Sequence, residues 1–265
     1  MCIIAFAWQL LPDYPLVLIA NRDEFYPRPS TAMTPWPDAP QIIGGRDLEA
    51  GGSWLASHED GRFAAVTNHR DGRNKLPAEL SRGKLIRDYL TGTDSAVDFC
   101  AQLQPELSRY GGFNLLLGDQ HGLYYQSNRG GDFQPLAPGI YGLSNALLDS
   151  PWPKTDALKQ RLADYLAQHP QPQSEQLLPL LWQRDTAADS QLPDTGVRYA
   201  WEKMLSACFI QASDLNYGTR ASTALVQHGN GQRGLMEQTF TAQGAAQRCH
   251  FEQQLEPVAT TENCS

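Results

Sequence analysis

The first 25 residues read MCIIAFAWQLLPDYPLVLIANRDEF. Two apolar runs, residues 2–9 and 16–20, flank a segment with the turn formers Pro and Asp. This pattern is typical of two antiparallel strands. It does not fit a signal peptide or a membrane helix, because no basic segment precedes it and prolines interrupt it. The second strand returns towards the start of the first, which brings the polar residues 21–24 beside Cys2.

Cys2 is the first candidate for chemistry. Initiator methionine is normally removed before a small residue, and loss of Met1 would leave a thiol and a free α-amine on Cys2. The usual pKa values are about 8.5 for the thiol and about 7.7–8.0 for the amine, so the amine can take the thiol proton without a histidine. The alternative is that Cys2 is a small apolar strand residue, which its position alone favours.

Four polar residues, Asn21-Arg22-Asp23-Glu24, end the second apolar run, where unpartnered side chains would be costly. Strand alternation places Arg22 and Glu24 on one face and their neighbours on the other. An arginine beside Cys2 would lower the thiol pKa, and a carboxylate there could orient the amine. The alternative is an ordinary hairpin exit with an ion pair at the surface.

Further polar candidates stand at the ends of expected strands. Asn68 and Asn145 each close a strand, and Arg220 opens one. Asparagine amides suit an oxyanion hole, and an arginine could bind a carboxylate or polarise a carbonyl. Each of these residues taken alone is also typical of a turn. Trp36 and Trp54 could wall a pocket, although packing in the core would explain them as well.

Hairpins dominate the rest of the chain. Residues 26–47, rich in Pro and Gly, are predicted as an ordered loop. Helices are predicted over 85–90 with a stop at Gly92, over 97–107 with a cap at Thr93 or Asp94, over 155–168 and near 174–184. Strands are predicted near 53–57, 62–68, 113–117, 123–127, 139–145, 207–211, 222–227, 235–240 and 248–253. This order favours an α+β fold, with two antiparallel sheets, outer helices and a single domain over residues 1–265.

The composition narrows the functional classes. A net charge of −8 over 265 residues disfavours nucleic acid as a partner. The five cysteines are an odd number without a C-x-x-C pair, so we expect no disulfide framework, no thiolate zinc site and a cytoplasmic location. The six histidines show no ligand spacing, and no run of about 20 apolar residues occurs. We therefore expect no metal and no integral membrane segment.

These residues belong to a set of motifs that spans nearly the whole chain. The motifs are Met1-Cys2-Ile3-Ile4, Asn21-Arg22-Asp23-Glu24-Phe25-Tyr26-Pro27-Arg28-Pro29, Gly44-Gly45-Arg46-Asp47, Gly51-Gly52-Ser53-Trp54-Leu55, Val66-Thr67-Asn68-His69-Arg70, Ser81-Arg82-Gly83, Gly142-Leu143-Ser144-Asn145, Leu192-Pro193-Asp194-Thr195-Gly196 and Tyr217-Gly218-Thr219-Arg220. In them the chain resembles the NRDE family, also called the transport and Golgi organisation 2 family. That family is similar to N-terminal-nucleophile hydrolases of the penicillin V acylase and bile salt hydrolase type, which implies a four-layer αββα sandwich.

The resemblance implies roles for individual residues. In those hydrolases the second strand ends in Arg-Asn-Leu-Asp, so the acid lies three residues after the arginine. Here Asp23 follows Arg22 at once, so either Asp23 lies past the strand end or Glu24 takes the role. By resemblance, the catalytic residues are Cys2 as nucleophile, Arg22, Asp23, Asn68, Asn145 and Arg220, and we assign Glu24, Trp54 and His69 to substrate binding.

Two functions follow as expectations. The first is an N-terminal cysteine amidohydrolase that cleaves a non-peptide C–N bond in a small or lipid-like substrate. The second is a carrier without catalysis that uses the same pocket for haem or an acyl-lipid, because members of the family are associated with haem trafficking, lipid or acyl-CoA metabolism and secretion. A protein-interaction role is a third, weaker alternative. We expect no resident cofactor, with haem only as a carried ligand, and the oligomeric state stays open.

Overall fold

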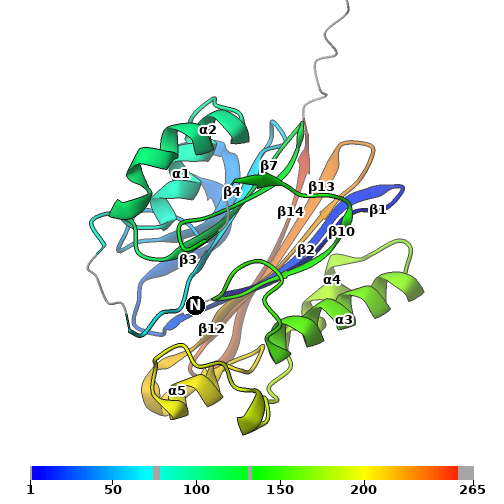
Figure 1. Cartoon of the computed structure of the whole chain (residues 1–265). Coiled ribbons are helices and arrows are strands. Elements are labelled where there is room, and N and C mark those ends of the chain that lie inside the picture. The colour runs from blue at the N-terminus through cyan, green and yellow to red at the C-terminus, as the bar shows by residue number, and fades with distance from the viewer. Residues whose placement is uncertain (1, 74–77, 131–132, 256–265) are drawn as a thin grey trace, which may run out of the picture.

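The fold consists of two seven-stranded sheets and the helices that cover them (Figure 1). The computed structural model describes residues 2–73, 78–130 and 133–255. Every pair of neighbouring strands in the two sheets is antiparallel. Many consecutive strands are neighbours in a sheet, which agrees with the hairpins expected from the sequence.

The first sheet carries the N-terminal hairpin near its centre. Its strands in spatial order are β10 (Gly139–Leu143), β1 (Cys2–Leu11), β2 (Tyr14–Phe25), β12 (Tyr217–Gln227), β13 (Gln232–Thr241) and β14 (Gly244–Gln254), with β11 (Gln211–Ala212) paired to β12. The pairing of β1 with β2 confirms the predicted hairpin and sets Cys2 opposite Arg22. Because β12 pairs with the other edge of β2, the polar end of β2 is held from both sides.

The second sheet contains one clear departure from the sequence prediction. Its strands in order are β3 (Ser30–Trp36), β4 (Ala39–Asp47), β5 (Leu55–His58), β6 (Phe63–Asn68), β7 (Phe113–Asp119), β8 (Gly122–Ser127) and β9 (Gln134–Pro135). The loop predicted over residues 26–47 is wrong, because β3 and β4 occupy most of it. The prolines misled the prediction: Pro35 lies at a bulge of the edge strand β3, where its missing N–H is tolerated.

Three large apolar clusters of the core separate the four layers. The middle cluster fills the space between the sheets, where Phe6 and Leu18 from the first sheet meet Phe63 and Leu116 from the second. Burial of such side chains is the main favourable term that holds the sheets together.

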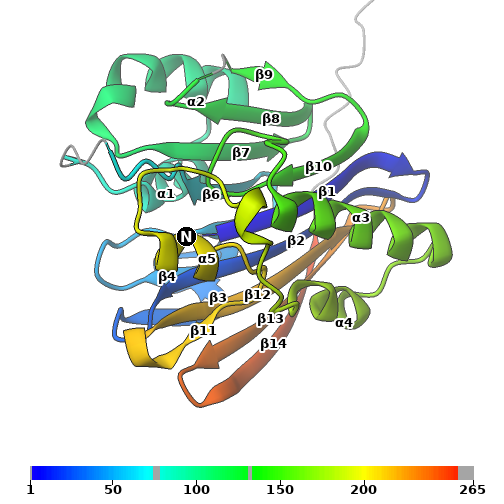
Figure 2. The same cartoon turned by 60° about the horizontal axis from the view of Figure 1, so that its bottom comes forward.

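Each sheet carries helices on its outer face. On the first sheet, α3 (Pro153–Gln168) packs Leu158 and Leu162 against Ile3 and Val17. On the second sheet, α1 (Gly83–Thr91) and α2 (Ala96–Leu103) bury apolar side chains against β6 and β7. Figure 1 shows the resulting order of helix, sheet, sheet and helix from upper left to lower right, and Figure 2 shows α3 and α4 in front of the first sheet. The predicted α+β class and αββα sandwich are thereby confirmed.

The helices differ in detail from their predicted bounds. Ser95, and not Thr93 or Asp94, caps α2, because its Oγ accepts the Asp98 N–H at 3.1 Å. The helix expected over 174–184 shortens to α4 (Ser174–Leu177) and a 3₁₀ turn (Leu178–Leu181), since Pro179 cannot donate a helical hydrogen bond. The remaining elements are α5 (Tyr199–Met204) and 3₁₀ turns over Gln104–Arg109, Asp189–Gln191 and Ser213–Leu215.

The strand predicted over residues 207–211 does not form, apart from Gln211 in β11. These residues are buried as irregular chain, with Ile210 in a small cluster with Leu205 and Tyr217. Burial without strand pairing explains why an apolar run gave a false strand signal.

Two sequence expectations concern the whole chain. Across residues 2–73, 78–130 and 133–255, no helix is long and apolar enough to cross a membrane. The thiols of Cys2, Cys100, Cys208 and Cys249 are free. Cys264 and the predicted loss of Met1 lie outside the described residues.

Candidate active site

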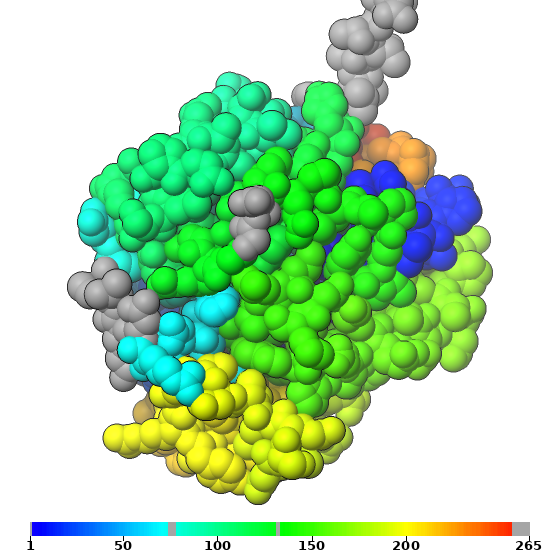
Figure 3. Space-filling view, viewed as in Figure 1, coloured from blue at the N-terminus to red at the C-terminus, as the bar shows by residue number. Residues whose placement is uncertain are grey.

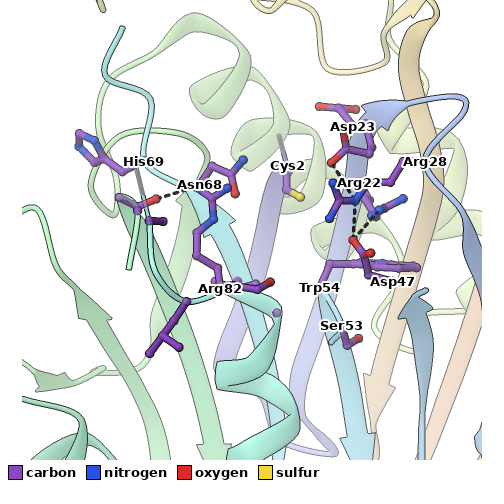
Figure 4. A pocket seen from close by; sticks show the side chains of 18 of the residues that line it. Cys2, Arg22, Asp23, Arg28, Asp47, Ser53, Trp54, Asn68, His69 and Arg82 are labelled. Carbon is purple, nitrogen blue, oxygen red and sulfur yellow. Dashed lines mark hydrogen bonds and ion pairs between the residues drawn. The ribbon is translucent and has the colours of Figure 1, made fainter. Parts of the chain in front are cut away.

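Cys2 opens into a cleft of about 560 Å³ at the start of β1. The cleft runs between the end of β2, the end of β6 and the chain that leads into α1. Seven of the nine predicted site residues line it: Cys2, Arg22, Asp23, Glu24, Trp54, Asn68 and His69. In Figure 4 the Cys2 side chain lies between Asn68 on one wall and Arg22 on the other.

Arg22 is held rigidly on the wall next to Cys2. Arg22 is only 5 % exposed. Its Nη2 lies 3.5 Å from Asp47 Oδ2, and its guanidinium carbon lies 4.3 Å from the centre of the Trp54 ring. Arg28 donates from Nε to the same Asp47 oxygen at 2.7 Å (Figure 4). The Arg22 Nη1 is buried and has no hydrogen-bond partner among the described residues, so it is available to a ligand.

Opposing effects act on the pKa of the Cys2 thiol. Burial raises the pKa, and the nearby Asp23 carboxylate acts in the same direction. The Arg22 guanidinium and a backbone hydrogen bond from Asp23 lower it, because both stabilise the thiolate. The net result is a raised pKa, so the thiol needs a nearby base to become nucleophilic near neutral pH.

Asp23 and Glu24 have different surroundings. Asp23 is 1 % exposed and accepts a hydrogen bond from Thr219 Oγ1 at 2.7 Å. Burial raises its pKa, and the buried ammonium of Lys154 is among the cations that oppose this rise. Glu24 is half-buried and accepts the N–H of Phe25 at 2.9 Å. Asp23 is therefore the more enclosed of the two acids beside Cys2.

The two asparagines are brought together, but only one faces the cleft. Asn68 lines it, whereas Asn145 is fully buried. The Asn145 Nδ2 donates to the Asn68 carbonyl at 3.0 Å, so this amide fixes the end of β6. Ser144 donates from Oγ to the Cys2 carbonyl at 3.2 Å and links the same segment to β1. Asn145 thus positions Asn68 and does not itself line the cleft.

The chain after Asn68 is fixed from a distant part of the sequence. The Arg70 N–H donates to the Asn145 carbonyl at 2.7 Å, and its side chain forms a buried ion pair with Glu202 of α5 at 3.1 Å. The Gly72 N–H donates to the Thr195 carbonyl at 2.7 Å. Figure 3 shows the cyan segment after β6 against the yellow segment that contains α5. This packing holds the rim of the cleft beside Asn68.

Arg220 lies outside the lining of the cleft. It occupies a bulge in β12 between the residues that pair with β2, and its Nη1 donates to the carbonyls of Phe25, Tyr26 and Arg28 at 2.9–3.1 Å. It borders a neighbouring hollow of about 180 Å³ together with Arg22 and Trp54. Its guanidinium therefore holds the chain that leaves β2 rather than facing Cys2.

The remaining predicted contact residues lie on opposite walls. The Trp54 ring supports Arg22, as described above. His69 lies on the far side of Asn68 from Cys2 in the view of Figure 4. Burial and the neighbouring Arg129 lower the pKa of His69, which favours the neutral ring.

The sequence matches the family model described as "Transport and Golgi organisation 2" over residues 1–242. The chain belongs to the Transport and Golgi organisation 2 family. The resemblance predicted from the sequence motifs is therefore confirmed.

Curated relatives of this family match over most of their length. The Transport and Golgi organization 2 homologue of Mus musculus is 33 % identical over 259 residues, which are 91 % of this chain and 93 % of the mouse protein. The Homo sapiens homologue is 32 % identical and the Drosophila melanogaster protein 28 % identical, with the same coverage.

Two solved structures are more distantly similar. The Caenorhabditis elegans orthologue of N-acylethanolamine-hydrolyzing acid amidase has a TM-score of 0.46 and 12 % identity, over 85 % of this chain and 92 % of that one. A mutant of the conjugated bile acid hydrolase from Clostridium perfringens has a TM-score of 0.41 and 9 % identity, over 95 % of this chain and 92 % of that one.

Several residues of the site in this Transport and Golgi organisation 2 family member were missed by sequence reasoning. Asp47, Arg28 and Arg82 line the cleft, and the three stand in motifs that were noted without an assigned role. Lys154 lies in the first turn of α3, is 6 % exposed and has its pKa lowered to about 8 by burial. Only the tertiary structure brings these residues to Cys2 or Asp23, so no local pattern could have identified them.

Proposed function

We propose that the chain, once Met1 is removed, is an N-terminal cysteine amidohydrolase that cleaves a C–N amide bond of a small substrate. The observation that carries the proposal is the register of β1 and β2, which sets Cys2 opposite Arg22 at the edge of a cleft. A thiol there can meet a substrate while a guanidinium and a backbone N–H stabilise its thiolate.

The proposed reaction has two halves, acylation of Cys2 and hydrolysis of the resulting thioester, and each half needs two proton transfers. The α-amine of Cys2 takes the thiol proton, the sulfur forms a bond to the amide carbon, and the carbonyl oxygen becomes an oxyanion. The amine then gives the proton to the leaving nitrogen as the C–N bond breaks, which leaves a thioester on Cys2. Water attacks the thioester, the amine takes its proton and returns it to sulfur as the C–S bond breaks, and the acid product leaves.

The other residues serve this reaction in different ways. The Asn68 amide is placed to donate to the oxyanion, and Asn145 holds Asn68 in place. Asp23 orients the amine of Cys2 from a fixed, buried position. Arg220 is a positioning residue, because its three hydrogen bonds set the path of the chain that follows β2.

The side chains around Cys2 favour binding of a polar ligand and disfavour an acyl chain or haem. Charged and polar residues form most of the lining, and Trp54, Val66 and Leu80 are its main apolar members. An acyl chain or a porphyrin gains most of its binding energy from apolar surface, which this cleft offers sparingly.

The test begins with the processed protein. Intact mass shows whether Met1 is absent, and limiting iodoacetamide at pH 7 then compares the thiols by peptide mapping. We expect Cys2 to label before Cys249, which is half-buried and has its pKa raised by burial to about 11. Faster labelling of Cys249 or Cys208 would remove Cys2 as the nucleophile.

Turnover is tested with a library of small amides by detecting the released amine. Activity should vanish in Cys2→Ala and persist in the matched control Cys249→Ala. Activity that survives Cys2→Ala would show that another residue is responsible.

A further inference from the structure

One wall of the cleft carries two arginines that have no acidic partner in the described part of the chain. Arg82 lies just before α1 and Arg129 just after β8, and both line the cleft. Neither forms an ion pair with any carboxylate of the described residues, whereas Arg22 and Arg28 on the opposite wall share Asp47. Within residues 2–73, 78–130 and 133–255, neither guanidinium of this wall is therefore neutralised by a direct ion pair, although Asp71 and Glu79 line the same cleft.

The two guanidinium groups lie against the same stretch of backbone. A Cβ at Gly111 would come 3.6 Å from Arg82 Nη1, and one at Gly112 would come 2.9 Å from Arg129 Nε. Arg82 also donates from Nη1 to the Gly112 carbonyl at 3.2 Å. A side chain at Gly112 would crowd Arg129, whereas one at Gly111 would make an ordinary contact with Arg82. Two neighbouring like charges repel each other unless an anion joins them.

The start of α1 adds a partial positive charge to this wall. This nine-residue helix has no side-chain hydrogen bond at its N-cap and no acidic residue in its first turn. Gly83, its first residue, lines the cleft. The N–H groups of Lys84 and Leu85 already donate to the Ser81 and Arg82 carbonyls at 3.1 Å, so this helix end contributes its dipole, which favours an anion, and not free donors.

An independent observation comes from the opposite wall. Arg22 is 5 % exposed, and its Nη1 has no partner within the described part of the chain although it lines the same cleft. Buried guanidinium N–H groups are normally satisfied, so an acceptor from a bound molecule is expected there. Glu79 of the lining is already paired with Arg109 and cannot serve the cationic wall.

We propose that the substrate of Cys2 carries a carboxylate, which binds Arg82 and Arg129 at the start of α1 while its amide lies at Cys2. This inference rests on the proposed hydrolase function and adds the class of substrate, a carboxylate-bearing amide such as an N-acyl amino acid. A carboxylate fits better than a phosphate dianion, because the acidic residues of the cleft lining repel a doubly charged group more strongly than a singly charged one. These residues are Asp23, Glu24, Asp47, Asp71 and Glu79. The planar carboxylate also matches the fork of a guanidinium.

The experiment compares two alkylating agents that differ only in charge. N-bromoacetylglycine carries the carboxylate and N-bromoacetylglycinamide does not, and both alkylate a thiol with loss of bromide. Rates at Cys2 are normalised to the rates with free cysteine ethyl ester. We expect the acid to react about tenfold faster than the amide, as a charge-assisted contact of ordinary strength predicts.

Two variants test whether Arg82 causes the difference in rate between the acid and the amide. Arg82→Gln should bring the acid-to-amide ratio close to one, whereas Arg87→Gln should leave it unchanged. Arg87 is the matched control, because it lies on α1, which begins directly after Arg82, but pairs with Asp88 and is not part of the cleft lining. A ratio of one or less in the unaltered protein, or an unchanged ratio in Arg82→Gln, would overturn the proposal. A bromoacetyl aminomethylphosphonate that reacts faster than the acid would show a phosphate-type site instead.

A separate measurement distinguishes failure of the inference from failure of the hydrolase proposal. If neither reagent labels Cys2, the proposed nucleophile is rejected. Calorimetric titration with N-acetylglycine and N-acetylglycinamide then tests the anion site alone. Binding of the acid that weakens about tenfold in Arg82→Gln supports the site, and equal or absent binding of both ligands rejects it.

Discussion

Glu237 makes the stability of the protein depend on pH, and replacing it with glutamine should remove that dependence. Glu237 lies on β13 and is 1 % exposed. Its Oε1 accepts the Met33 N–H of the other sheet at 2.7 Å, and its Oε2 accepts Thr223 Oγ1 at 3.3 Å. Burial raises its pKa from 4.5 to about 7, because the charged form loses its hydration between the sheets.

The direction and size of the effect follow from these two values. Below pH 4.5 the carboxyl is protonated in both states and contributes no pH dependence. Between pH 4.5 and 7 the unfolded chain loses the proton while the folded one keeps it, so the free energy of unfolding falls as pH rises. The difference between a pKa of 4.5 in the unfolded chain and about 7 in the folded protein corresponds to about 3 kcal/mol in the free energy of unfolding. This contribution is lost in full above pH 7.

Urea unfolding at pH 5 and pH 8 tests this expectation. Glu237→Gln keeps an acceptor for the Met33 N–H and has no charge to bury. Its free energy of unfolding, relative to that of the unaltered protein, should therefore rise by about 3 kcal/mol from pH 5 to pH 8. Glu59→Gln is the matched control, since Glu59 is exposed in the turn between β5 and β6. Parallel stability curves for the unaltered protein and Glu237→Gln would refute the reasoning.

Three further predictions follow from contacts at and near the site. Arg22→Gln removes the guanidinium that favours the Cys2 thiolate, so alkylation of Cys2 at pH 7 should slow and its pH profile should move to higher pH; an unchanged profile would contradict this. Asn114→Leu removes a buried amide that bonds to two carbonyls and two hydroxyls, and should lower the free energy of unfolding by about 3 kcal/mol in urea titration. Gly142→Ala would place a Cβ 2.4 Å from Thr155 Cγ2, so α3 must shift, with a loss of about 1–3 kcal/mol; a loss under about 0.5 kcal/mol would show that the contact relaxes freely.

Much of the fold could be predicted because its strongest signals are local. The apolar runs of β1 and β2 and the turn between them lie within 25 residues, and they fix the register that places Cys2 beside Arg22. The prediction failed over β3 and β4, where Pro and Gly suggested a loop. There the pairing with a neighbouring strand and burial against the other sheet overcome weak local preference.

The candidate site was predictable in part, again because some of its residues have local sequence signals. Residues on β1, β2 and β6 follow from strand ends and family motifs. Nothing in the sequence shows that Asn145 is buried behind Asn68, or that Arg220 holds the chain after β2, because both facts depend on contacts between distant segments. The basic wall of Arg82 and Arg129 was hidden for the same reason, since the two residues lie far apart along the chain.

The position of β2 between β1 and β12 has a consequence during synthesis. Asp23 and its partner Thr219 are separated by 196 positions, so the ribosome must make most of the protein before the carboxyl beside Cys2 finds its place. Long-range pairing of this kind is slow, so Asp23 becomes enclosed by β12 only late in folding, after the hairpin of β1 and β2 can pair.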